Sequence, residues 1–219
     1  TYTRQKDLRV QQVLAGIAAS LHKFALDFRV LQSPPFGEWA EPFGQKQVGS
    51  SAMPFKRNPI NTENICSLAR YVAGLPAVAW DNASQAILER SLDDSANRRL
   101  FQAEGFLATD ELLRRATRIV AEMVIDEDAI ARNMAIYGPF AATERVLMAL
   151  VAAGASRQDG HEWIREASLQ AWAVLRDGRS NPLVDLLVND GRIRQFLTAD
   201  QVTELMRAEG HVGTAVSRA

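Results

Sequence analysis

The sequence predicts an all-α protein, in which a bundle of long helices is followed by a smaller helical domain. One observation is the stretch from Thr3 to Gln32, which contains no proline and a single glycine. Its apolar residues also recur at alternating steps of four and three, the period of helices packed in a left-handed bundle. Finally, breaks at glycine and proline become frequent after Met123. We therefore expect a bundle domain over residues 1–123 and a C-terminal helical domain over residues 124–219.

The first predicted helix is long for a compact domain. A helix of this length extends roughly 45 Å, which suits a bundle that assembles with partner chains. Its expected buried seam consists of Val10, Leu14, Ile17, Leu21, Phe24, Phe28 and Leu31.

A proline-rich stretch from Ser33 ends this helix, and a loop over residues 46–61 follows. The second helix is expected to begin at Asn61 or Thr62, and Gly74 and Pro76 to kink or end it, because proline removes a backbone donor. Residues 77–88 are again predicted to be helical. A third helix, capped by one of the residues at 93–95, is expected to run to Met123.

Within the smaller domain, several segments punctuate a series of shorter predicted helices. Among these breaks are Tyr137-Gly-Pro139, Gly154, Gly178 and Asn189-Asp-Gly191. Thr198 and Gln201 have the spacing of a capping box, which opens one more helix.

Composition limits the classes of partner. The net charge of -1 gives no indication of a nucleic acid or an acidic membrane surface as partner. No apolar run approaches the roughly 18 to 20 residues that span a bilayer. The single cysteine, Cys66, fits a reducing cytoplasm and is expected to be a buried thiol. No Cys/His spacing indicates a metal site, and no cofactor motif is present.

The loop over residues 46–61 concentrates groups suited to an anionic substrate. Ser50 and Ser51 supply hydroxyls, Lys56 and Arg57 supply cations, and Asn58 supplies an amide. Gly49, Pro54 and Pro59 favour a loop rather than a helix.

The run Gly49-Ser-Ser-Ala-Met-Pro-Phe-Lys-Arg-Asn-Pro59 resembles the signature loop of the fumarase/aspartase superfamily, in its adenylosuccinate lyase form. The resemblance implies β-elimination of fumarate from adenylosuccinate and from succinylated aminoimidazole carboxamide ribotide, in purine biosynthesis. It implies Ser50 as general base, although Ser51 stays open as the alternative. Lys56 and Asn58 would bind the succinyl carboxylates and the developing negative charge. The further residues implied are Ser51 and Met53 as substrate contacts, and Glu63 as the acid that orients a catalytic histidine.

A second cluster lies between Arg90 and Arg99. Ser95 and Arg99 would share one face near a helix N-terminus, which fits either a phosphate site or an ordinary capped surface helix. The segment resembles the one in adenylosuccinate lyases whose Arg, Ser and second Arg hold the nucleotide phosphate, which implies Arg90, Ser95 and Arg99. Asn64 lies where relatives carry Arg or Asn against the substrate, so the preference between the two substrates stays open.

The family's general-acid histidine has no counterpart among His22, His161 and His211. The chain therefore resembles the C-terminal part of such a lyase without the N-terminal region. The resemblance implies a homotetramer whose sites each draw on three subunits. We expect these residues alone to be inactive, yet able to complement a partner that carries the histidines. Two alternatives remain: a related lyase or cycloisomerase, acting on argininosuccinate or a carboxymuconate-type acid, and a non-catalytic helical assembly module.

Overall fold

The computed structural model describes residues 2–42, 57–88, 91–208 and 212–218, and the chain divides into two units. Unit 1 is Thr1–Asp126 and unit 2 is Glu127–Ala219. Long helices dominate both units, so the predicted all-α class is confirmed. The division follows Asp126 rather than Met123, because the chain just after Met123 pairs with an earlier segment of unit 1.

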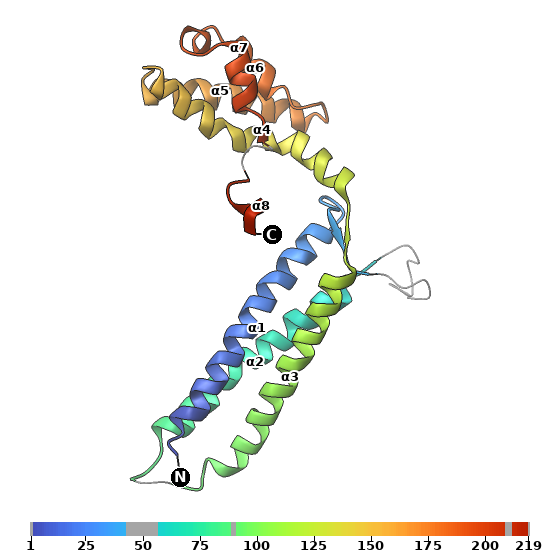
Figure 1. Ribbon diagram of the computed structural model, residues 1–219, viewed down its shortest axis with the longest axis vertical. Helices are drawn as coiled ribbons and strands as arrows, with labels where there is room; N and C mark the ends of the chain where they lie inside the picture. The colour runs from blue at the N-terminus through green and yellow to red at the C-terminus, as the bar shows by residue number, and fades with distance from the viewer. Residues whose placement is uncertain (1, 43–56, 89–90, 209–211, 219) are drawn as a thin grey trace. The chain divides into compact units, whose positions relative to one another are not determined.

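Unit 1 is a bundle of three long helices (Figure 1). They are α1 (Gln5–Gln32), α2 (Ile60–Ser84) and α3 (Ser95–Glu122). The Asn82 and Asn97 side chains exchange two hydrogen bonds, of 2.7 and 3.1 Å. Near the other end of the same helices, Arg115 donates to Asn61 at 3.1 Å. Helices α2 and α3 are therefore antiparallel neighbours.

The buried residues of α1 recur at the predicted steps of three and four, but they are partly different residues from the predicted seam. Leu14 and Phe28 are buried as expected, whereas Val10 is 38% exposed. The other four predicted seam residues are partly buried: Ile17, Leu21, Phe24 and Leu31. The other buried residues of α1 are Asp7, Leu8, Gln11, Ala18 and Ala25. Apart from Leu8, these residues are small or polar, so a seam predicted from large apolar side chains does not include them.

Helix α2 continues through Gly74 and Pro76, so the predicted end of the helix at these residues is wrong. Leu75 and Ala79 flank the proline and are buried in one cluster with Leu8 of α1 and Phe101 of α3. This packing offsets the hydrogen bond that proline removes from a helix interior. The helix then ends at Ser84, before the expected Leu88.

Unit 1 also contains a short antiparallel pair of strands. Strand β1 (Trp39–Ala40) pairs with β2 (Val124–Ile125). The backbone N–H of Asp126 also donates to the carbonyl of Glu38 at 2.8 Å. The Trp39 ring packs against Phe28, with ring centroids 5.5 Å apart, and so fixes the strand to the core.

Unit 2 packs its own core, formed by residues such as Val146, Leu150, Ala171 and Leu187. Its elements are α4 (Glu127–Ala152), α5 (Arg157–Arg176), α6 (Leu183–Asn189), the 3-10 helix η1 (Ile193–Gln195), α7 (Ala199–Leu205) and α8 (Ala215–Arg218). The capping box of Thr198 and Gln201 is confirmed at the start of α7.

The expectation of a helix break at Tyr137-Gly-Pro139 is wrong, because α4 runs through Pro139. The Asn181 side chain donates to the carbonyl of Ile136, in the turn before the proline, at 2.7 Å. By length and composition α4 is also apolar enough to cross a membrane, contrary to the expectation from the sequence, although core helices pass the same test. Its buried residues include Ala142, Val146 and Leu150 in the core of unit 2.

Candidate active site

The start of α2 is capped by a carboxylate from a distant part of the chain. Pro59 occupies the N-cap position and provides no side-chain acceptor for the first turn. Glu41 provides it instead: its Oε2 accepts from the Asn61 backbone N–H at 3.1 Å, and its Oε1 accepts from the Thr62 backbone N–H at 2.7 Å. The Ile60 N–H donates to the carbonyl of Asn58 at 2.9 Å. Every backbone donor of the first turn is therefore satisfied.

Side chains complete the same cluster. The Asn61 amide and the Thr62 hydroxyl also donate to the Glu41 carboxylate, at 2.9 and 2.8 Å. Gln32, the last residue of α1, accepts from the Glu41 N–H at 2.9 Å and donates to the carbonyl of Arg57 at 3.3 Å. Arg115 of α3 donates to the Asn61 side chain. We call Gln32, Glu41, Asn61 and Thr62 the loop-end cluster.

Several predicted site residues lie beside the loop-end cluster. Asn58 is half-buried just before α2, whereas Glu63 and Asn64 are exposed in its first turns. Glu63 lies 3.9 Å from Arg29 of α1, so this acid already has a cation near it. The predicted residues Ser50, Ser51, Met53 and Lys56 lie outside the described part of the chain.

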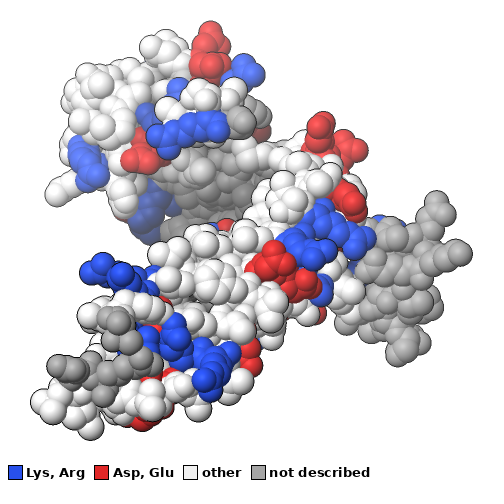
Figure 2. All heavy atoms as spheres, turned by 60° about the horizontal axis from the view of Figure 1, so that its bottom comes forward, with Lys and Arg blue, Asp and Glu red and all other residues white. Residues whose placement is uncertain are grey.

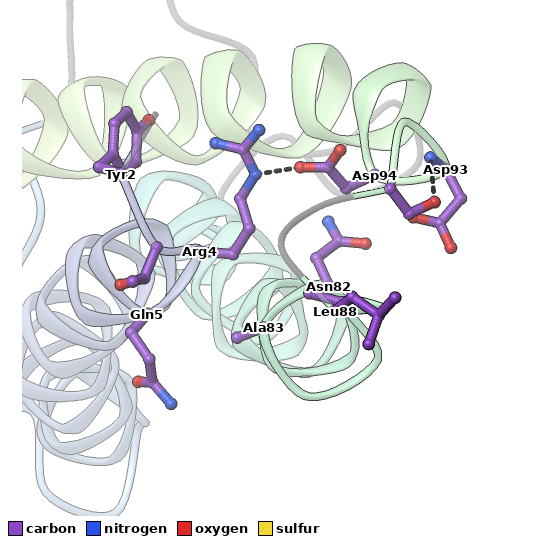
Figure 3. Close-up of a pocket in the computed structure, with 11 residues that line it drawn as sticks. Tyr2, Arg4, Gln5, Asn82, Ala83, Leu88, Asp93 and Asp94 are labelled. Carbon is purple, nitrogen blue, oxygen red and sulfur yellow. Dashed lines mark hydrogen bonds and ion pairs between the residues drawn. The ribbon is translucent and has the colours of Figure 1, made fainter.

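A second polar cluster lies at the opposite end of unit 1, where α1 and α3 begin (Figure 3). Arg4 points toward Asp94 and pairs with its carboxylate, at the edge of a pocket of about 360 Å³. Arg98 Nε donates to Asp7 at 2.6 Å, and the Tyr2 hydroxyl donates to the same carboxylate at 2.8 Å. These contacts join the start of α1 to the first turn of α3.

The charge of Asp7 depends on these contacts. Burial alone raises the pKa of the Asp7 carboxyl, but hydrogen bonds from Arg98, Tyr2 and Gln102 outweigh burial and hold the pKa below its ordinary value. Asp7 is therefore ionised in the folded chain at neutral pH, and it supports the segment that opens α3.

Two of the three predicted phosphate-binding residues belong to this end. Ser95 is half-buried in the first turn of α3, and Arg99 is exposed one turn later on the same face. Arg98 is held by Asp7, whereas Arg99 makes no ion pair with any residue that the structure describes. Basic side chains gather at this end of unit 1 in Figure 2. Arg90 lies outside the described residues.

The two clusters are far apart within one copy of the chain. Between Glu63 and Asn82, α2 is roughly 28 Å long at about 1.5 Å per residue. Asn82 contacts Asn97 in the first turn of α3, so Ser95 and Arg99 lie at the distant end. Unit 1 therefore does not bring Ser95 and Arg99 together with Asn58 and Glu63.

Sequence reasoning missed Glu41 and Gln32. The only local sign of such a partner was the proline before α2, which leaves the first-turn donors without a nearby side-chain acceptor. Among the described ranges, no group of three or more His, Cys, Asp or Glu side chains could hold a metal ion.

Comparison with known proteins first defines the class. A family profile described as Lyase matches residues 1–74. The crystal structure of a fumarate lyase from Mesorhizobium superposes with a TM-score of 0.80, covering 98% of this chain and 46% of that one at 21% identity. The chain therefore has the helical fold of the fumarase/aspartase superfamily of lyases.

The sequence comparisons show a similarity to adenylosuccinate lyases in particular. A profile described as Adenylosuccinate lyase C-terminus matches residues 139–218. The adenylosuccinate lyases of Schizosaccharomyces pombe and Saccharomyces cerevisiae are 41% and 42% identical, each covering 98% of this chain. The chain is thus a sequence relative of the adenylosuccinate lyases, as the signature loop predicted. It spans 44% of the length of both relatives.

Proposed function

We propose that this chain supplies two of the substrate-binding parts of an adenylosuccinate lyase. In the proposed reaction a base removes a proton from the carbon next to a succinyl carboxylate. The bond between the other carbon and nitrogen then breaks, an acid protonates the nitrogen, and fumarate leaves. The substrates would be adenylosuccinate and succinylated aminoimidazole carboxamide ribotide. Identity of 41% to the fission-yeast enzyme supports this reaction over those of more distant lyases.

Each part has its own task. Ser50 would act as the base, while Lys56 and Asn58 bind the carboxylates and stabilise the charge that develops on them. Glu63 would orient a histidine supplied by another segment. Ser51, Met53 and Asn64 would contact the substrate around these groups. Arg90, Ser95 and Arg99 would bind the phosphate, where the helix N-terminus and the guanidinium groups favour an anion.

The observation that carries the proposal is the separation of Asn58 and Glu63 from Ser95 and Arg99, along a helix of roughly 28 Å between Glu63 and Asn82. One nucleotide substrate is too short to contact Asn58 and Glu63 at one end of α2 and Ser95 and Arg99 at the other end. A working site would then combine the loop side of one copy, which carries Asn58 and Glu63, with the phosphate side of another copy, which carries Ser95 and Arg99. We infer an assembly of several copies, a homotetramer in the cytoplasm, in which this chain alone is inactive.

Exposed apolar side chains on α3 support such an assembly. Phe106, Leu113 and Val120 follow one another at seven-residue intervals and are 55%, 44% and 59% exposed. A seven-residue repeat keeps such residues on one stripe of a bundle helix. Covering that stripe with a second copy would bury apolar area that is otherwise in water.

A mixing experiment tests the proposal. The chain is mixed with the Schizosaccharomyces pombe enzyme in which the serine corresponding to Ser50 is alanine, and fumarate release from adenylosuccinate is followed by ultraviolet absorbance. We expect no turnover from either protein alone and recovered turnover from the mixture. A Ser50→Ala chain is the matched control and should recover nothing.

A second variant tests the composite site. In the recovered site the base comes from this chain and the phosphate contacts come from the partner. Arg99→Gln in this chain should therefore leave the recovered rate within about twofold, whereas Ser50→Ala abolishes it. An equal loss from both variants would show that one copy provides both sets of residues and would contradict the composite site. If subunits exchange but no mixture is active, the assembly-module alternative is favoured.

A further inference from the structure

The loop-end cluster joins the chain on both sides of the predicted signature loop. Glu41 precedes this loop, and Asn61 and Thr62 follow it, yet one buried carboxylate holds the two sides together through four hydrogen bonds of 2.7 to 3.1 Å. Glu41 is only 5% exposed. A buried carboxylate is costly unless it is fully hydrogen-bonded, so these four donors account for its presence.

Contacts with other parts of unit 1 also fix the backbone at Glu41. This residue directly follows β1, which pairs with β2, and the Trp39 ring of β1 packs on Phe28 of α1. Its backbone N–H donates to Gln32. The carboxylate therefore lies on a fixed part of unit 1, and the first turn of α2 is positioned against it.

We propose that Glu41 is a positioning residue for the elimination chemistry, an inference that rests on the function proposed above. It sets where α2 begins, and thereby the places of Asn58 and Glu63, which lie within a few residues of Asn61 and Thr62. Glu41 touches no reacting atom in this role. Misplacing catalytic groups by about 1 Å costs up to ~10²-fold in rate, so loss of the cap lowers turnover.

Glu41→Gln is the informative substitution because it keeps the shape of the side chain. All four partners donate to the carboxylate, and a glutamine accepts at only one of its two terminal positions. Its amide nitrogen would then face a backbone N–H. Glu122→Gln is the matched control, since that carboxylate lies at the end of α3 with its side chain 55% exposed.

The variants are tested in the mixing assay, with the chain supplying the loop side of the recovered site. We expect Glu41→Gln to lower the recovered kcat about tenfold or more, and Glu122→Gln to leave kcat within about twofold. Thr62→Val removes one hydroxyl donor and should lower kcat less than Glu41→Gln. The double variant Glu41→Gln/Thr62→Val should have the same kcat as Glu41→Gln alone, because both substitutions act on one cluster. Additive effects, or a kcat for Glu41→Gln equal to that of the control, would overturn the positioning role.

Amide hydrogen exchange on the chain provides a readout that needs no turnover. In Glu41→Gln the backbone amides of Asn61 and Thr62 should exchange faster, while that of Val72, in the middle of α2, is unchanged. Unchanged exchange at Asn61 and Thr62 would show that Glu41 does not hold the turn. Absence of fumarate from the unsubstituted mixture contradicts the proposed function instead, and exchange then decides whether Glu41 caps α2.

Discussion

Phe28 connects the core of unit 1 to the strand that carries Glu41, and Phe28→Ala tests that connection. Phe28 is fully buried, with its ring 5.9 Å from Phe24 and 5.5 Å from Trp39 between centroids. Truncating a buried phenylalanine to alanine typically lowers the free energy of unfolding by about 3–5 kcal/mol. The two ring contacts, worth about 0.5–1.5 kcal/mol each, are part of that cost. We expect a loss of about 4 kcal/mol from the unfolding free energy of unit 1.

The loss can be measured by urea denaturation followed by far-ultraviolet circular dichroism. Phe36→Ala makes the same chemical change at a side chain that is 41% exposed, and should cost about 1 kcal/mol or less. A loss below about 1 kcal/mol for Phe28→Ala would refute the assignment of Phe28 to the core. It would also remove the reason to regard β1 as fixed.

Two further predictions concern stability. Asp7 has a lowered pKa in the folded chain, so its contribution is present above the ordinary carboxyl pKa of about 4 and is lost as pH falls through the lowered value. Asp7→Asn should therefore cost about 2 kcal/mol near pH 7 and much less near pH 2, in denaturation measured at both pH values; an equal cost at both would contradict the role of the charge. In unit 2, Thr198→Ala removes the capping box with Gln201 and should lower the unfolding free energy by about 1 kcal/mol, whereas Thr203→Ala, at an exposed site, should change it by a few tenths. Equal effects of the two threonine substitutions would show that the cap is not important.

Local signals in the sequence predicted the helices of unit 1 well. Apolar periodicity located α1, and the acidic run before Ser95 located the start of α3. The errors occurred where tertiary packing overrides local preference. Pro76 and Pro139 lie inside continuous helices because buried neighbours hold the chain on both sides of each proline.

The candidate site was predictable only in part. Its chemistry could be inferred from the serines, lysine and asparagine of one loop, and from the arginines that flank Ser95. Glu41 gave no such signal, because its partners lie about twenty residues further along the chain and depend on the folded position of β1. The distance between the loop side and the phosphate side likewise depends on α2 being one unbroken helix.

That unbroken helix restricts how the chain can change in length. Inserting a single residue between Glu63 and Asn82 would turn one end of α2 relative to the other by about 100° and lengthen it by about 1.5 Å. The side chains that contact α1 and α3 on one side of the insertion would then face away from their partners. Inserting seven residues would nearly restore the facing, but would move the two ends apart by about 10 Å. Substitutions along the exposed side of α2 are therefore compatible with the bundle, whereas insertions and deletions are not.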